Sequence, residues 1–129
     1  MTGDQAFVEA LEAEIPDRDS LKLVKTRAAG YAKEHPAREC YETACLCYQS
    51  ENFQVQEVGV FLMGAAAGQV PEALAFLHDV VSRHESWKVQ ETLAMAFDDH
   101  CRREGYEKTV PLIVDPALSA WRPLPGPDT

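Results

Sequence analysis

Apolar residues recur along most of this chain at the three- and four-residue spacing of helices that bury one face. Two stretches 34 residues apart show this spacing most clearly, and we expect each to place a stripe of side chains in the core. The earlier stripe consists of Val55, Gly59, Leu62, Met63 and Ala66, and the later one of Val89, Leu93, Ala96, Phe97 and His100. No alternating run of β-branched residues between turn signals predicts a strand. The pattern therefore predicts an all-α protein, in which Gly59 allows a close helix approach.

Capping residues and prolines divide the chain into about seven predicted helices. Their ranges are about 4–14, 20–35, 37–49, 52–68, 71–84 and 86–105, and a seventh starts at residue 106. The connections are short, which favours antiparallel neighbours. From about residue 115 onward the chain carries four of its eight prolines. We therefore predict one helical domain over residues 1–114 and an irregular proline-rich tail over 115–129.

A short phrase occurs twice: NFQVQEV at residues 52–58 and SWKVQET at residues 86–92 are near copies offset by 34 residues. One further predicted helix lies between the copies, so the repeating unit is a helical hairpin. Hairpins that each leave an apolar face for the next one form α-solenoids. The tetratricopeptide signature is absent. We predict a right-handed α-solenoid of antiparallel, HEAT-like hairpins.

The predicted helix over 86–105 has an unusual polar face. Trp87, Glu91 and Asp98 lie on the arc opposite its packing stripe, with the tryptophan one turn before the first carboxylate. These three residues are candidates for a catalytic site. The same pattern also permits a structural interpretation, in which Trp87 is a wedge between helices and Glu91 is a surface acid facing Lys88 or Arg102.

Glu57 is the repeat equivalent of Glu91. If their two helices line the concave surface, both carboxylates face one groove, which attracts a cation or developing positive charge. Three lysines lie on one stripe of the predicted helix over 20–35, and the groove accommodates phosphate only where these lysines flank it. The residues expected to contact DNA or another partner are Lys22, Lys25, Lys33, Arg38, Glu57, Lys88 and Arg102.

The charge of the chain is uneven. The formal net charge is −9 at pH 7, which opposes non-specific attraction to a nucleic-acid backbone. Residues 22–38 nevertheless carry five basic side chains and one acidic one, a local charge of +4. A basic surface on this protein would therefore have to be built by that segment.

Cysteine and histidine spacing gives no sign of a metal or redox centre. The four cysteines contain no Cys-x-x-Cys pair, and no two of the four histidines are one helical turn apart. We expect reduced, buried cysteines, no metal and no cofactor. No apolar run is long enough to cross a membrane, and the N-terminus lacks a secretory pattern. We expect a cytoplasmic protein with no membrane partner.

Two long segments carry a family resemblance: FQVQEVGVFLMGAAA at 53–67 and ALAFLHDVVSRHESWKVQETLAMAFDDHCRREGYEKTVPLI at 73–113. Across about residues 35–114 the chain resembles the HEAT-like proteins of the bacterial DNA alkylation repair family, the AlkD-like group. The stretch from Trp87 through Asp98 is the most specific part. The family pattern continues through further repeats, so from the resemblance we expect a member that is shortened at its C-terminus.

The resemblance implies a solenoid whose positively charged concave face holds double-stranded DNA. If the chain is active, it implies a DNA N-glycosylase, a hydrolase that excises cationic alkylated bases. Trp87 matches the family's tryptophan, and Glu91 takes the position of the acid, which is usually Asp in active members. In the family this acid stabilises positive charge that develops on the sugar as the glycosidic bond breaks.

Two other functions are compatible with the residues. One is a non-catalytic helical-repeat scaffold that holds a protein or peptide partner in its groove. The other is self-association through the last hairpin, with an interface over residues 106–121.

Overall fold

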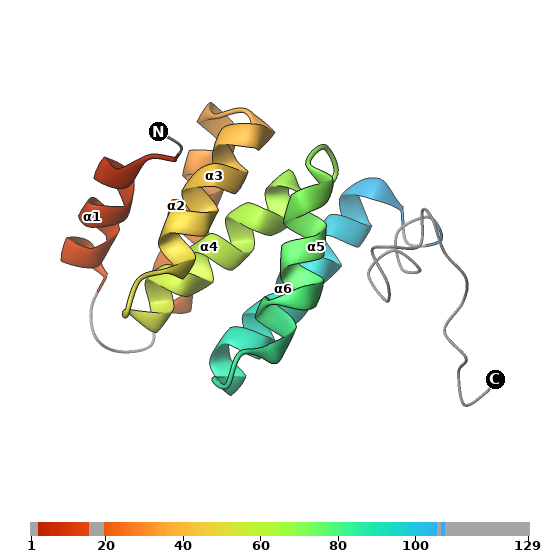
Figure 1. Cartoon of the computed structure of the whole chain (residues 1–129). Coiled ribbons are helices and arrows are strands. Elements are labelled where there is room, and N and C mark those ends of the chain that lie inside the picture. Colours follow the sequence, from red (N-terminus) through yellow and green to blue (C-terminus); the bar gives the residue numbers. More distant parts are fainter. Residues whose placement is uncertain (1–2, 16–19, 106, 108–129) are drawn as a thin grey trace.

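The computed structural model describes residues 3–15, 20–105 and 107. Within these residues the chain forms six α-helices and one short 3-10 helix, η1, and no strand (Figure 1). The elements are α1 (Gln5–Glu14), α2 (Leu21–Glu34), α3 (Ala37–Tyr48), α4 (Phe53–Ala66), α5 (Pro71–Asp79), η1 (Val81–Arg83) and α6 (Trp87–Glu104). The predicted all-α class is confirmed. The seventh predicted helix and the proline-rich tail lie outside the described residues.

Local signals mark several of the helix ends. The backbone N–H of Phe7 donates to the Asp4 carboxylate at 3.0 Å at the start of α1, and that of Gln54 donates to the Asn52 side chain at 2.9 Å at the start of α4. Helix α6 stops at Gly105, whose φ of 98° is a conformation that favours glycine. Except at the end of α5, the predicted helix ends agree with the observed ones to within one or two residues.

The fifth helix is shorter than predicted: α5 ends at Asp79 and η1 follows it. The Nε2 group of Gln90 donates to the carbonyl oxygens of Val81 and Ser82, at 3.1 and 2.9 Å. These carbonyls are therefore satisfied by a side chain from α6, and a continued α5 is not needed for them. The prediction to residue 84 was wrong because this partner comes from another helix.

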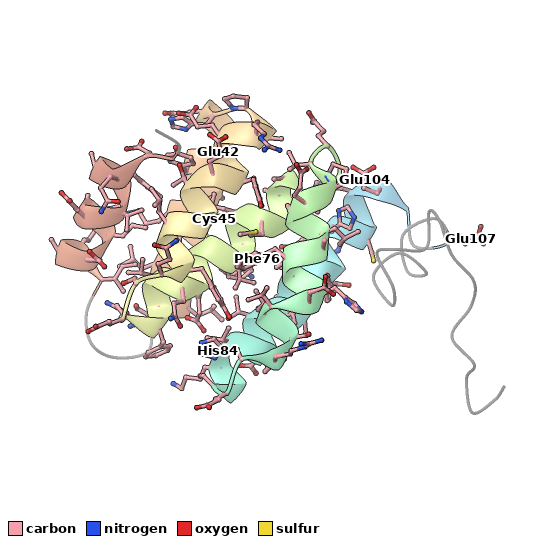
Figure 2. The ribbon with its side chains drawn as sticks, in the orientation of Figure 1. Glu42, Cys45, Phe76, His84, Glu104 and Glu107 are labelled. Atoms are coloured by element: carbon pink, nitrogen blue, oxygen red, sulfur yellow. The ribbon has the colours of Figure 1, made fainter. Side chains whose placement is uncertain are left out.

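The helices form hairpins that stack so that α4 lies at the centre. It packs against α2 and α6 in its own layer and against α3 and α5 in the other layer. In the view of Figure 1, α3 lies over α2, and α5 lies over α6. The ring of Tyr48 on α3 contacts the rings of Phe76 and His84 of the third hairpin, at centroid distances of 5.3 and 5.8 Å (Figure 2). The helical-repeat architecture is confirmed.

The repeated phrase makes a repeated hydrogen bond. Gln56 Nε2 donates to the carbonyl oxygen of Ser50 at 2.8 Å, and Gln90 Nε2 donates to that of His84, also at 2.8 Å. Both donors and both acceptors are 34 residues apart. The glutamine in each copy therefore fixes the turn that leads into the second helix of its hairpin.

Both predicted packing stripes enter the core. Val55, Leu62 and Met63 of α4 are buried, as are Val89 and Ala96 of α6. A Cβ added at Gly59 would lie 2.9 Å from the backbone oxygen of Ala44 on α3, which confirms that this glycine permits close packing.

Candidate functional site: the α2–α4–α6 groove

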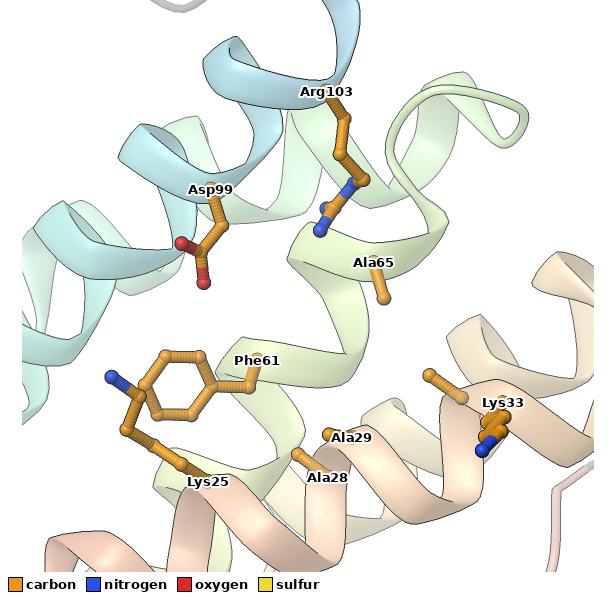
Figure 3. Close-up of a pocket in the computed structure, with 9 residues that line it drawn as sticks. Lys25, Ala28, Ala29, Lys33, Phe61, Ala65, Asp99 and Arg103 are labelled. Carbon is orange, nitrogen blue, oxygen red and sulfur yellow. The ribbon is translucent and has the colours of Figure 1, made fainter.

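A groove with a volume of about 480 Å³ opens between α2, α4 and α6 (Figure 3). We call it the α2–α4–α6 groove. The lining residues from α2 are three or four positions apart and so belong to one face of that helix. The groove is lined by Lys25, Ala28, Ala29, Ala32, Lys33, Phe61, Ala65, Asp99 and Arg103.

The groove carries excess positive charge, because its lining contains three cationic side chains and one carboxylate. Lys25 and Lys33 form no ion pair with any part of the chain that the structure describes. Arg103 Nη2 donates to the carbonyl oxygen of Gly64 at 2.8 Å, which fixes it against α4. One Asp99 oxygen lies 3.5 Å from Arg102 Nη2.

Three cations elsewhere on the surface have carboxylate partners. Arg27 pairs with Glu14, and Arg102 pairs with Asp98. Arg38 lies on α3, in the other layer, and its Nη1 is 3.0 Å from a Glu72 oxygen. Arg38 therefore lies apart from the lysines of α2, and its contact with DNA or another partner stays a prediction. The cations of the groove are thus less neutralised than these three.

The three predicted catalytic residues all belong to α6. Trp87 is its first residue, and its side chain lies outside the described part of the structure. Glu91 is exposed, and so is Asp98, whose carboxylate accepts a hydrogen bond from Arg102. Glu91 precedes the groove residue Asp99 by eight positions, which is about 12 Å along the helix. The candidate acid therefore lies beyond the end of the groove, on an adjoining stripe of α6.

Glu57 does not share a groove with Glu91. It is only 4% exposed, and the Thr92 hydroxyl on α6 donates to its carboxylate at 2.8 Å. A Cβ added at Gly64, two turns further along α4, would lie 3.0 Å from Ala96 of α6. The prediction that both carboxylates face one groove was wrong, because α6 covers the side of α4 that carries Glu57.

The other predicted contact residues have different surroundings. Lys22 is exposed on α2, one turn before Lys25 on the same stripe. Lys88 is half-buried, with its Nζ 5.5 Å from the centre of the Phe53 ring. Of the predicted set, the structure therefore brings only Lys25 and Lys33 into the groove, and Lys22 extends the same stripe.

Three groove residues were not predicted: Phe61, Asp99 and Arg103. Asp99 and Arg103 are one turn apart on α6, at the margin of its packing stripe, and the sequence shows this spacing. Which margin of α6 faces α2 depends on how the helices cross, and one helix alone does not determine that. Figure 3 shows Asp99 projecting from α6 toward Phe61, and Arg103 projecting toward α4 near Ala65.

The cysteines are structural in this fold. Cys40, Cys47 and Cys101 are buried, and Cys45 on α3 is half-buried (Figure 2). Burial raises the pKa of the Cys47 thiol to about 12. Within the described residues, no group of three or more histidine, cysteine or acidic side chains has an arrangement that could hold a metal ion. In the same residues, no helix combines the length and apolar character needed to cross a membrane.

Two solved structures match this fold over most of the chain. AlkD2 from Streptococcus mutans is 35% identical with a TM-score of 0.77, over 88% of this chain and 55% of that one. The protein smu.31 from Streptococcus mutans UA159 is 37% identical with a TM-score of 0.75, over 88% of this chain and 54% of that one. The chain thus spans about half the length of each. No protein-family model and no curated protein matches it.

Proposed function

Because the chain belongs to the AlkD-like family of helical-repeat proteins, we propose that it recognises alkylated DNA through the face formed by α2, α4 and α6. The observation that carries this proposal is the pair of lysines, Lys25 and Lys33, that lack a carboxylate partner among the described residues. They belong to a protein whose formal net charge is −9. Unneutralised cations on such a protein are suited to phosphate groups.

The distribution of charge favours one orientation of DNA on this face. Lys22, Lys25 and Lys33 form a cationic strip along α2, whereas α6 exposes the carboxylates of Glu91 and Asp98. Phosphates are attracted to the strip and repelled by the exposed Glu91 carboxylate near the start of α6, whereas Asp98 is neutralised by Arg102. A duplex bound in this way places its backbone along α2 and a cationic base near α6.

In this proposal Glu91 is the acid that acts on the lesion. Its carboxylate stabilises the positive charge that develops on the deoxyribose when the bond from C1′ to the base nitrogen breaks. The cationic base leaves as a neutral base with the bond's electron pair, and water supplies hydroxide to C1′ and releases a proton. Trp87, one turn earlier, contacts the lesion. Asp98 is the second acid of this face and is held by Arg102.

The test is binding of a duplex that carries a stable cationic base analogue, compared with an undamaged duplex, by fluorescence anisotropy. We expect tighter binding of the damaged duplex by the native chain and loss of this preference in Glu91→Gln. The matched control is Glu85→Gln, which removes one exposed acid from the loop before α6 and should retain the preference.

Two salt concentrations separate lesion recognition from attraction to the backbone. Affinity for both duplexes should fall between about 50 and 200 mM salt, while the ratio between them stays nearly constant. A preference that is equal in Glu91→Gln and Glu85→Gln removes Glu91 from the proposal. Absence of any DNA binding at low salt rejects the proposal as a whole and leaves a scaffold for a protein partner as the better account.

A further inference from the structure

The α2–α4–α6 groove has the size and the lining of a small-ligand site. Its volume of about 480 Å³ lies within the roughly 300–1,000 Å³ that is typical of ligand pockets. Its floor combines the methyl groups of four alanines with the half-buried ring of Phe61. In Figure 3 this ring points into the open space between α2 and α6. An aromatic ring in this position offers a face on which a planar group can stack.

Of the polar groups of the groove, Lys25 and Asp99 lie beside that ring, and Lys33 lies further along α2 (Figure 3). Lys25 and Lys33 are eight residues apart on α2, which separates their backbones by about 12 Å. Asp99 projects from α6 on the other side of the ring (Figure 3). This set of groups matches the parts of a nucleotide. The two lysines suit two phosphates, the aromatic ring suits a base, and the carboxylate suits an exocyclic amine.

We propose that this groove is a single-nucleotide site. Phe61 stacks on the base, Asp99 accepts a hydrogen bond from its exocyclic amine, and Lys25 and Lys33 bind the phosphates on its 5′ and 3′ sides. The inference rests on the proposed function in that it assigns one nucleotide of the bound DNA to this groove. The same chemistry also fits a free nucleotide that carries both phosphates, and the experiment below separates the two sources.

The free-nucleotide test is a calorimetric titration with 2′-deoxyadenosine 3′,5′-bisphosphate, compared with the 5′-monophosphate, the nucleoside and inorganic phosphate. We expect the bisphosphate to bind about tenfold more tightly than the monophosphate, because it occupies both lysines. Thymidine 3′,5′-bisphosphate has no exocyclic amine and should bind more weakly. Asp99→Ala should remove this difference between the two bases.

Variants assign the binding to the groove. Lys25→Gln and Lys33→Gln should each weaken binding of the adenine bisphosphate about tenfold, and Phe61→Leu should weaken it while keeping an apolar floor. The control is Arg83→Gln, which removes one exposed cation from η1, outside the groove, and should leave the affinity unchanged. Thermal unfolding of each variant verifies that the fold is retained.

The outcomes distinguish this inference from the proposed function. No bisphosphate binding at millimolar concentration overturns the nucleotide site, and so does equal weakening by Arg83→Gln and the groove variants. Duplex binding without bisphosphate binding leaves the proposed function standing and rejects this inference. Bisphosphate binding in the groove without binding of a single-stranded or duplex oligonucleotide identifies a free nucleotide as the ligand and rejects the proposed function.

Discussion

Glu57 and Glu91 occupy equivalent positions in consecutive repeats and have opposite surroundings. Glu57 is buried and accepts a hydrogen bond from Thr92, whereas Glu91 is exposed. Glu57 is buried because α6 covers this side of α4, whereas Glu91 lies on the exposed face of α6 itself. Gln56 and Gln90, by contrast, make the same hydrogen bond. One repeated phrase therefore holds a glutamine that builds each hairpin and a glutamate whose role changes along the chain.

His100 is a second buried polar residue and belongs to the packing stripe of α6. It is 3% exposed, and its Nδ1 has no hydrogen-bond partner among the described residues. Burial lowers the pKa of its imidazole, which is therefore held in the neutral form in the folded protein. The unfolded chain binds a proton at this residue below its ordinary pKa of about 6.5, where the folded protein does not.

The free energy of unfolding should therefore fall as the pH drops below about 6.5 and be insensitive to His100 above it. Urea unfolding at pH 7.5 and 5.5 measures this loss of stability, at pH values above the range in which carboxylates titrate. The variant His100→Leu removes the titrating group at similar volume and should show a smaller loss. Equal losses in the native chain and the variant would contradict this account of His100.

At the scale of the element, α4 shows most clearly what a single helix can and cannot predict. Its packing stripe was correct, but the arc containing Glu57 was expected to face a groove and is buried. The sequence did contain a signal, because residues 58–66 are apolar nearly all round, and such a helix is buried on several sides. A helical wheel shows which face of a helix is the most apolar. How many faces are buried depends on the neighbouring helices.

Two glycines in different helices should respond oppositely to alanine. Gly59→Ala should lower the free energy of unfolding by about 1–3 kcal/mol, since its Cβ meets the backbone of α3 at 2.9 Å. Gly30→Ala on α2 meets nothing within 4 Å and should raise it by about 0.5–1 kcal/mol through helix propensity. Urea unfolding measures both values. A stabilising Gly59→Ala would show that α3 and α4 are further apart than described.

Element contacts also explain why only part of the groove could be predicted. The lysine stripe of α2 follows from helical spacing, so Lys25 and Lys33 were found in advance. Phe61 could not be distinguished by sequence from the other apolar residues of α4. Arg103 could not be placed because its partner, the Gly64 carbonyl oxygen, belongs to a different repeat. Their convergence depends on the crossing of three helices, which the sequence pattern of each helix does not contain.

At the scale of the whole molecule, the separation of charge matters more than its sum. The net charge of −9 would repel DNA at a distance, yet the strip along α2 remains without carboxylate partners in the described part of the chain. Such a strip attracts phosphate locally, and its effect weakens with salt. The molecule is thus expected to bind DNA on one face and at low ionic strength.

The most direct test of this account compares two double variants that each remove two cations. Lys25→Gln/Lys33→Gln alters the groove, and Arg27→Gln/Arg83→Gln alters cations outside it, one of them on another side of α2. Duplex binding is measured by anisotropy from about 50 to 200 mM salt. We predict that the groove variant binds far more weakly and that its slope of log affinity against log salt is smaller by about 2, while the control keeps the native slope. Equal losses in the two double variants, or no duplex binding by the native chain, would contradict the central claim that the α2–α4–α6 face binds DNA.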